Sequence, residues 1–294
     1  MTSDQGEQTI FCFGEILWDC LPAGLFLGGA PINVAYHLKR HGKSVVPITA
    51  IGNDFLGREA VRRLENWNVD IDGVGFSEKS TGVVIAQIDS HGNASYNIVE
   101  DVAWDEISLS SALDSDVKNA SAIVFGSLAL RSSNNQLVLK SILQKANDAL
   151  KVFDVNLRPP YDNLVLVKEM AQIADLVKLN HEEASVLVGG KSSDYEVNAR
   201  KIADETDTPT VCITAGGNGA GLFKDGQWFW ESAKPVEVKD TVGAGDSFLA
   251  SLLSGLIDGD QSPKQLLRAA CRLAEFVASC HGAQPQYEPK NLVS

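Results

Sequence analysis

Short apolar runs alternate with helical patterns through the second half of the sequence, and this alternation restricts the possible folds more than any other feature. The apolar runs that we interpret as buried strands cover residues 122–125, 152–155, 176–179 and 211–214. The spacing of apolar residues between them predicts helices near 136–150, 181–188 and 195–205. Because a helix that connects two parallel strands packs on the sheet, this alternation predicts a parallel sheet with helices on both faces.

The two ends of the chain extend this α/β pattern. We expect strands at 9–13 and 45–51, helices at 31–41 and 56–67, and closing helices at 246–257 and 263–279. Two further segments have the pattern of antiparallel hairpins, at 82–99 with its turn at 90–93 and at 220–230. We expect the first hairpin to form a flap beside the main sheet and the second to form a sheet edge. The sequence has no long Pro/Gly/Ser linker, which favours one domain with an appended flap.

Composition excludes several classes of function. The chain has 294 residues and a formal net charge of −13. Such acidity argues against sequence-independent nucleic-acid binding and against docking on anionic membranes, although a local backbone cradle can still bind a nucleotide. The five scattered cysteines form no C-x-x-C pair, so we expect neither a disulfide framework nor a zinc site. The polar first eight residues are unlike a secretory signal and no apolar run could span a bilayer, which predicts a cytoplasmic protein.

The segment DTVGAGDSF at residues 240–248 carries the clearest chemical signal. Gly243, Ala244 and Gly245 have almost no side chains and lead into an apolar helical pattern, so free N–H groups and the positive end of the helix dipole would meet there. That combination suits a bound phosphate. The negative charge of Asp246 would oppose phosphate binding, so an acid at this position suggests a different role. The simplest role is to accept the proton of an attacking alcohol. Taken alone, a short glycine motif is more often only a turn that caps a helix.

A second small-residue motif, GGAPINVA at residues 28–35, leads into the first expected helix. Its two glycines would let a ligand approach the backbone closely. Asn33 offers both a donor and an acceptor, which suits a sugar hydroxyl. From these residues alone, a ligand site and a simple helix N-terminus are equally good interpretations.

In order and spacing, these two motifs resemble the signatures of the PfkB (ribokinase-like) carbohydrate kinases. The resemblance extends from Phe13 to Ala283, and within the family segments 126–129 and 154–160 are most similar to those of fructokinases. It implies a ribokinase-like three-layer α/β/α fold with a mostly parallel central sheet and a small β-flap that acts as a lid. It further implies a single kinase domain over 1–294, with lid segments near 17–28 and 81–103.

The resemblance assigns roles around both motifs. It makes Asp246 the catalytic base, and the N–H groups of Ala244, Gly245 and Asp246, with Gly243, the anion hole for the moving phosphate. For the acceptor sugar it indicates Asp19, Gly29, Asn33 and Arg158. A carboxylate such as that of Asp19 can accept two strong hydrogen bonds from sugar hydroxyls. The alternatives are an exposed loop acid for Asp19 and a surface cation for Arg158.

Further residues are associated with ATP and cations through the same resemblance. Asn180 and Glu183 match an N-x-x-E motif linked to magnesium and phosphate through water, with Glu183 as the magnesium residue; this fits an ion that keeps most of its hydration shell. The alternative is a helix N-cap by Asn180. The nucleotide would lie on the loop after the last parallel strand, for which the residues are Thr214, Gly216 and Gly219; a tight turn is the alternative. Asp240 and Thr241 match part of a monovalent-cation site, which would take K⁺.

Our leading hypothesis is therefore an ATP- and Mg²⁺-dependent sugar kinase that phosphorylates a primary hydroxyl, with fructose as the sugar. The alternatives in the same class are a 2-keto-3-deoxygluconate kinase, a ribokinase and a nucleoside kinase. From another class, a sugar-binding regulator without catalysis would use the same fold, but it would not need the base. The chain after Phe13 lacks the glycine fingerprint of a dinucleotide-dependent oxidoreductase. The segment 20–27 is shorter than the corresponding lid segment of many relatives. The sequence is therefore compatible both with a monomer and with a homodimer joined through the lid.

Overall fold

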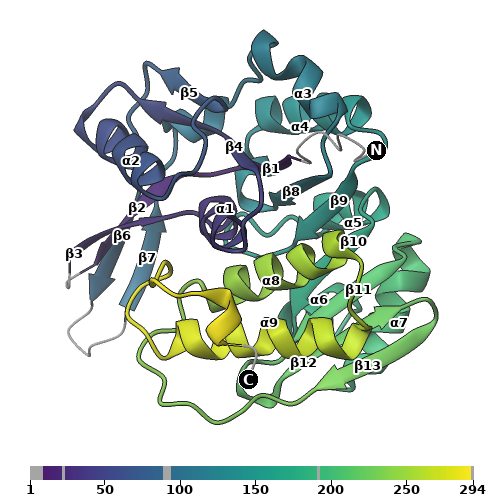
Figure 1. Ribbon diagram of the computed structural model, residues 1–294. Coiled ribbons are helices and arrows are strands. Elements are labelled where there is room, and N and C mark those ends of the chain that lie inside the picture. The colour runs from purple at the N-terminus through teal and green to yellow at the C-terminus, as the bar shows by residue number, and fades with distance from the viewer. Residues whose placement is uncertain (1–8, 22–23, 89–93, 191–192, 293–294) are drawn as a thin grey trace, which may run out of the picture.

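The computed structural model describes residues 9–292 except 22–23, 89–93 and 191–192. Within these residues a nine-stranded sheet has the order β13-β12-β11-β10-β9-β8-β1-β4-β5 (Figure 1). Its strands are β1 (Ile10–Phe13), β4 (Val45–Gly52), β5 (Val74–Ser77), β8 (Ala122–Gly126), β9 (Leu150–Asp154), β10 (Leu176–Asn180), β11 (Thr210–Thr214), β12 (Ala220–Lys224) and β13 (Gln227–Glu231). Neighbouring strands from β5 to β11 are parallel, whereas β12 and β13 are antiparallel and form one edge. The predicted α/β class and the predicted edge hairpin are both confirmed.

Helices cover both faces of this sheet and complete three layers (Figure 1). One face packs against α3 (Asp114–Lys118), α4 (Ser133–Lys145), α5 (Leu164–Gln172), α6 (His181–Leu187) and α7 (Tyr195–Thr206). The opposite face packs against α1 (Ala30–Arg40), α2 (Phe55–Asn66), α8 (Ala244–Asp258) and α9 (Pro263–Ala278). Short 3₁₀ turns lie at Ala103–Glu106, Ser111–Leu113, Leu128–Arg131, Gly216–Asn218 and Pro289–Asn291.

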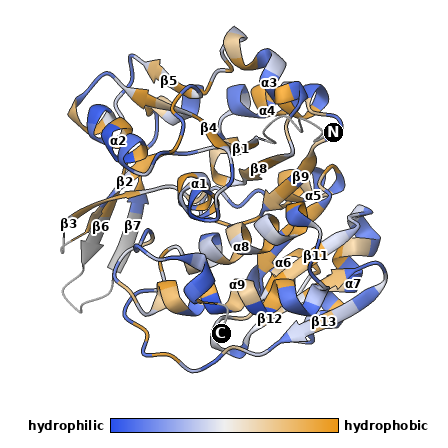
Figure 2. Ribbon diagram, in the orientation of Figure 1, coloured by the Kyte–Doolittle hydropathy of each residue, from blue (hydrophilic) through white to orange (hydrophobic). Residues whose placement is uncertain are grey.

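Alternation along the strands divides the hydrophobic core between the two faces. In β1, Phe11 and Phe13 point to the α4 side, and Ile10 and Cys12 point to the α8 side. Both faces are apolar, which is why the central strands are mostly hydrophobic in Figure 2.

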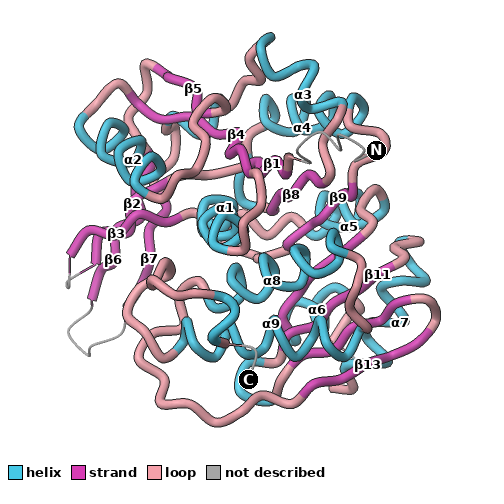
Figure 3. The backbone as a smooth tube through the Cα atoms, in the orientation of Figure 1, coloured by secondary structure: helices cyan, strands magenta, loops and turns pink. Residues whose placement is uncertain are grey.

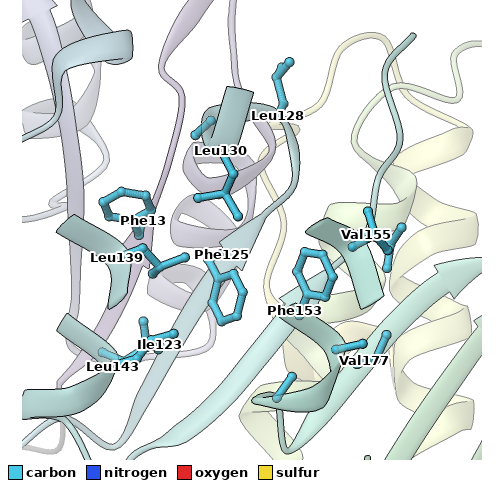
Figure 4. Packing of buried hydrophobic residues seen from close by; sticks show 14 of the residues in the cluster. Phe13, Ile123, Phe125, Leu128, Leu130, Leu139, Leu143, Phe153, Val155 and Val177 are labelled. Atoms are coloured by element: carbon cyan, nitrogen blue, oxygen red, sulfur yellow. The ribbon is translucent and has the colours of Figure 1, made fainter. Parts of the chain in front are cut away.

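On the α4 side, the rings of Phe125 and Phe153 stack with their centroids 5.2 Å apart (Figure 4). Each is completely or almost completely buried. Burying one such ring contributes about 1.5–3 kcal/mol to stability.

A separate four-stranded sheet has the order β3-β2-β6-β7, and it lies to one side of the central sheet (Figure 3). Its strands are β2 (Leu17–Leu21), β3 (Gly24–Gly28), β6 (Gly82–Ile88) and β7 (Ala94–Ile98). The predicted hairpin corresponds to β6 and β7, which pair antiparallel, and its turn at 90–93 lies outside the described residues. β2 pairs antiparallel with β3 and parallel with β6. Segments expected to form a lid therefore share one small sheet.

Most predicted boundaries lie within two residues of those observed, but the bounds of the helix expected near 136–150 are wrong, since the helix covers Ser133–Lys145. The helix α4 ends at Lys145, and Ala149 then donates a turn hydrogen bond to Ala146. Leu150 cannot continue the helix because it pairs with Ala122 as the first residue of β9. Among the described elements, β2, β3, β5, α3 and α5 had no counterpart in the sequence-based assignment of strands and helices.

Candidate functional site

The residues selected from the sequence lie mainly in segments that follow the parallel strands. Arg158 follows β9, Asn180 ends β10 and Thr214 ends β11. Because these strands run in the same direction, their carboxyl ends share one edge of the sheet, which is where open α/β sheets bind ligands.

The first turn of α8 forms the turn predicted to bind an anion. Gly243 is its N-cap residue with φ +77°, and a Cβ at this position would lie 2.4 Å from the Cβ of Ala283. In the described structure no side chain caps this helix end. Amides in the first turn have no intrahelical acceptor, so those of Gly245 and Asp246 remain suited to an external anion. The fold therefore has a physical reason for glycine at 243 besides any ligand.

Asp246 is buried and is oriented by a short chain of amide groups. Its Oδ2 accepts a hydrogen bond of 2.7 Å from Nδ2 of Asn33 on α1. Oδ1 of Asn33 accepts a 2.5 Å bond from Nε2 of Gln284, which also donates to the backbone oxygen of Leu27. Gln284 therefore holds the Asn33 amide with its nitrogen toward Asp246. The structure thus brings together residues from the two sequence motifs.

The surroundings of Asp246 set its protonation. Its pKa is raised to about 6, mainly by burial and also by the nearby Asp154 carboxylate, while Lys178, Asn33 and Arg158 act in the opposite direction. At neutral pH the carboxylate is then mostly ionised while being a stronger base than an exposed aspartate. These are the properties of a general base.

The residues expected at the sugar lie around β2 and β3. Asp19 is on β2, and a Cβ at Gly28 would lie 2.5 Å from its carboxylate, so glycine at 28 leaves room for this side chain. Burial raises the pKa of Asp19 to about 6, and Arg158 opposes this effect. The exposed Arg158 also lowers the pKa of Asp246, so its charge acts on both carboxylates. Gly29 has φ +105° and is closely packed against the backbone oxygen of Glu15.

Glu15 is a buried acid that the sequence did not single out as a site residue. Its Oε1 accepts a bond of 3.1 Å from the first amide of α1, at Ala30, and its buried Oε2 has no hydrogen-bond partner. Burial raises its pKa to about 7, and the charge of Asp246 contributes in the same direction. A buried acid of this kind cannot be recognised from the sequence, because a single acid after a strand resembles any acidic residue of a loop.

The N-x-x-E residues form a reciprocal helix cap. Oδ1 of Asn180 accepts from the amide of Glu183, and Oε2 of Glu183 accepts from the amide of Asn180, both at 2.8 Å. Oε1 of Glu183 accepts from the amide of Leu157 at 2.8 Å, which ties the loop after β9 to α6. The helix N-cap that was the alternative interpretation of Asn180 is therefore present in the structure.

This cap is compatible with magnesium held through water. Each oxygen of Glu183 accepts one N–H and keeps capacity for a bond from water, which suits an ion that retains its hydration shell. Across the described ranges, no group of three or more His, Cys, Asp or Glu side chains is arranged to hold a metal directly.

The remaining predicted residues divide into two loops. After β11, a Cβ at Gly216 would meet nothing within 4 Å, whereas one at Gly219 would lie 2.1 Å from the backbone oxygen of Glu231. Packing thus explains Gly219 but leaves open space at Gly216. Asp240 accepts bonds from the amides of Val242 and Gly282, at 3.0 and 3.2 Å.

Thr241 and Thr214 contribute backbone and hydroxyl contacts at the same edge. The backbone oxygen of Thr241 accepts the amide of Ala244, so the segment expected to hold a monovalent cation lies directly before α8. The hydroxyl of Thr214 donates to the backbone oxygen of Leu179 at 3.4 Å, which fixes the end of β11 against β10.

A buried ion pair next to α8 was missed entirely. Nζ of Lys178 on β10 lies 3.0 Å from both carboxylate oxygens of Asp154 on β9. The only signal in the sequence is one charged residue in each of the strands expected at 152–155 and 176–179, whose other residues are apolar. The sequence does not show that these two charged residues are in register.

Comparison with known proteins adds independent evidence. A family profile described as pfkB family carbohydrate kinase matches residues 11–291. The Pyrococcus horikoshii protein "Putative sugar kinase PH1459" is 32% identical over 238 residues, covering 78% of this chain and 73% of that protein. The Arabidopsis thaliana protein "Probable fructokinase-7" is 30% identical over 275 residues, covering 85% and 79%.

Solved structures are similar over nearly the whole chain. The crystal structure of the uncharacterised Pyrococcus horikoshii sugar kinase has a TM-score of 0.83 at 26% identity and covers 97% of each chain. A fructokinase from Xylella fastidiosa with bound ATP has a TM-score of 0.85 at 22% identity and covers 98% of each chain.

Among the described helices, none is long and apolar enough to cross a membrane.

Proposed function

The chain belongs to the pfkB family of carbohydrate kinases and is an ATP-dependent sugar kinase, and we propose that its sugar is fructose, phosphorylated on the primary 6-hydroxyl. The products would be fructose 6-phosphate and ADP. One observation carries the kinase chemistry: a buried carboxylate, Asp246, stands in the same helix turn as the amides suited to a phosphate. The choice of fructose rests on the similarity of residues 126–129 and 154–160 to those of fructokinases.

The chemistry follows from that arrangement. Asp246 accepts the proton of the primary hydroxyl, and the resulting oxygen attacks the γ-phosphorus of ATP in line. The amides of Gly245 and Asp246, with that of Gly243, and the dipole of α8 stabilise the charge that develops on the transferred group. The Ala244 amide, also assigned to the anion hole from the sequence, donates to the backbone oxygen of Thr241 in this structure. Asn33 keeps the carboxylate oriented through its 2.7 Å hydrogen bond.

Binding of the sugar is assigned to the residues around β2. Asp19 would accept hydrogen bonds from the sugar hydroxyls, and Asn33 could both donate to them and accept from them. The backbone of Gly29 would lie beside the ring, and Arg158 adds positive charge to this acidic site. The small sheet of β2, β3, β6 and β7 would close over the sugar and exclude water, so that ATP is not hydrolysed instead.

ATP and its cations are assigned to the neighbouring loops. Thr214, Gly216 and Gly219 would hold the nucleotide, with the open space at Gly216 available to it. When bound, Mg²⁺ offsets negative charge on the phosphates, and Glu183 and Asn180 would hold it through water. Asp240 and Thr241 are the proposed residues for K⁺. One structural relative is described with ATP and Mg²⁺, and another with fructose, ADP and potassium.

A sugar panel tests the choice of substrate. Release of ADP is measured with fructose, 2-keto-3-deoxygluconate, 5-dehydro-2-deoxygluconate, ribose and a nucleoside, and the rate without sugar is subtracted. We expect fructose to have the highest kcat/KM. A higher value for another sugar would replace fructose while leaving the kinase chemistry intact. No sugar-dependent rate across a broad panel would favour a regulator that binds sugar without catalysis.

A further inference from the structure

Lys178 occupies an unusual place for a charged residue. It lies in β10 between Val177 and Leu179, which point to the apolar α4 side, so Lys178 points to the α8 side. Its register partner on β9 is Asp154, and the Lys178 ammonium binds both oxygens of that carboxylate at 3.0 Å. Both side chains are less than one-tenth exposed.

The ammonium also lies directly against the turn that precedes Asp246. A Cβ at Gly245 would be 3.0 Å from Nζ of Lys178 and 3.9 Å from its Cε. The missing side chain at Gly245 therefore makes room for this ammonium beside the first turn of α8. Because Asp246 is the next residue, a positive charge is fixed next to the proposed base.

Stability alone does not explain the pair. Taking two charges out of water is costly, and well-packed apolar residues in their place are often as stabilising or more so. The neighbourhood is also unbalanced, because three carboxylates act on the one ammonium, those of Asp154, Asp246 and Glu183. Only Asp154 forms a direct ion pair with Lys178 among the contacts of the described residues.

We propose that Lys178 is a positioning residue for phosphoryl transfer: its ammonium, held by Asp154 against Gly245, is the counter-charge that keeps Asp246 ionised beside the substrate hydroxyl. This proposal rests on the proposed role of Asp246 as the base. It assigns Asp154 a role as well, since that carboxylate holds the ammonium in place.

The two members of the pair act on Asp246 with opposite sign. The charge of Asp154, the larger of the two effects, raises the pKa of Asp246, and the charge of Lys178 lowers it. The other groups that face Asp246 are Asn33 on α1 and Arg158 after β9, which lower its pKa, together with Glu15 after β1, whose own pKa is raised by Asp246. A loss of packing alone would not produce opposite shifts from the two substitutions.

The experiment titrates Asp246 directly and without turnover. The protein is labelled with ¹³C at aspartate carboxyl groups, the Asp246 signal is assigned by its loss in Asp246→Asn, and its pKa is measured in each variant. We expect Lys178→Met to raise the pKa of Asp246 by about one unit or more and Asp154→Asn to lower it. Lys168→Met, which removes an exposed lysine from α5, is the matched control and should leave the pKa unchanged.

A second comparison is available if Lys178→Met does not fold. Asp154→Asn and the double variant Asp154→Asn/Lys178→Met differ only in the lysine and leave no unpaired Asp154 behind. The pKa of Asp246 should be higher in the double variant than in Asp154→Asn. Equal values in these two proteins, or equal values in wild type and a folded Lys178→Met, would overturn the proposal.

Activity measured on the same proteins separates this proposal from the proposed function. If Lys178 acts through Asp246, the acid limb of the pH profile of kcat/KM moves in each variant as the Asp246 signal does. An unshifted acid limb with kcat lowered at every pH would also overturn the proposal, because Lys178 would then act on the phosphate or only on structure. If the Asp246 signal shifts as expected but no sugar is phosphorylated, the proposed function fails while the effect of Lys178 on Asp246 stands.

Discussion

The two faces of β9 and β10 differ in what they bury. On the α4 side these strands present Phe153 and Val177, which pack into a continuous apolar core. On the α8 side, one residue further along each strand, they present Asp154 and Lys178. The first face needs nothing beyond hydrophobic burial to explain it. The second places charges where burial is costly, next to the turn that carries Asp246, which indicates that its sequence serves chemistry more than stability.

The largest expected effect is a loss of activity from a substitution on the α8 side that leaves the fold intact. Asp246→Asn removes the proton acceptor but keeps the shape of the side chain, so we expect kcat to fall by roughly 10²–10⁴-fold. The midpoint of thermal unfolding should not fall, because the substitution removes a buried charge. Steady-state kinetics and thermal denaturation on one preparation measure both. Turnover close to wild type would remove Asp246 from its role.

A substitution on the α4 side should have the opposite result, a loss of stability without a loss of activity. Phe125→Ala removes the ring that stacks on Phe153, so the free energy of unfolding should fall by about 3–5 kcal/mol. The kcat of the folded protein should stay at the wild-type value, because Phe125 lies on the face away from Asp246. Urea denaturation and kinetics well below the melting temperature test this pair of outcomes. A large loss of kcat in the folded protein would show that the two faces are not separable.

Stability as a function of pH sharpens the comparison. The pKa of Asp246 is raised to about 6 in the folded protein, above its ordinary value of 3.8, so the folded state binds the proton more tightly than the unfolded state. The stabilisation is present at low pH and is lost as pH rises from about 4 to about 6, by about 3 kcal/mol in total. Asp246→Asn lacks this titration, so wild type should lose stability relative to the variant over that range. Denaturation curves at several pH values measure it, and a constant difference between the two proteins would contradict the raised pKa.

The smallest effect is expected when the buried pair is removed as a unit. Lys178→Met alone leaves Asp154 unpaired and should cost about 3–5 kcal/mol, whereas Asp154→Asn/Lys178→Met should lie within about 1 kcal/mol of wild type. Urea denaturation of the three proteins tests this. If the double variant were as unstable as the single one, the pair would be needed for stability and the contrast between the faces would weaken.

Local pattern was sufficient to predict most of the fold. The strands and helices with clear periodicity lie close to where they were expected, and the small residues before an apolar helix located the turn at Gly243. The strands β2 and β3 were missed because only two residues separate Leu21 from Gly24, which leaves no clear gap between the two strands in the sequence. The helix α4 was extended too far because Ala146, Ala149 and Leu150 continue the apolar composition past its end.

The site could be predicted only where its residues form a motif. Asn33 and Asp246 each belong to one, although their hydrogen bond joins positions 213 residues apart. Gln284, Lys178 and Glu15 belong to no sequence motif. Their role depends on which helix end packs against them in the folded protein. Such relations are set by tertiary packing and strand register, which a single sequence does not show.

The central claim is that the first turn of α8 receives the transferred phosphate while Asp246 faces the attacking hydroxyl. A crystal structure with fructose and a non-hydrolysable ATP analogue tests it most directly. We expect the γ-phosphate within hydrogen-bonding distance of the amides of residues 243–246, and the 6-hydroxyl of fructose in contact with the Asp246 carboxylate. A triphosphate that lies away from this turn, or a sugar whose reacting hydroxyl contacts another residue instead, would contradict the account.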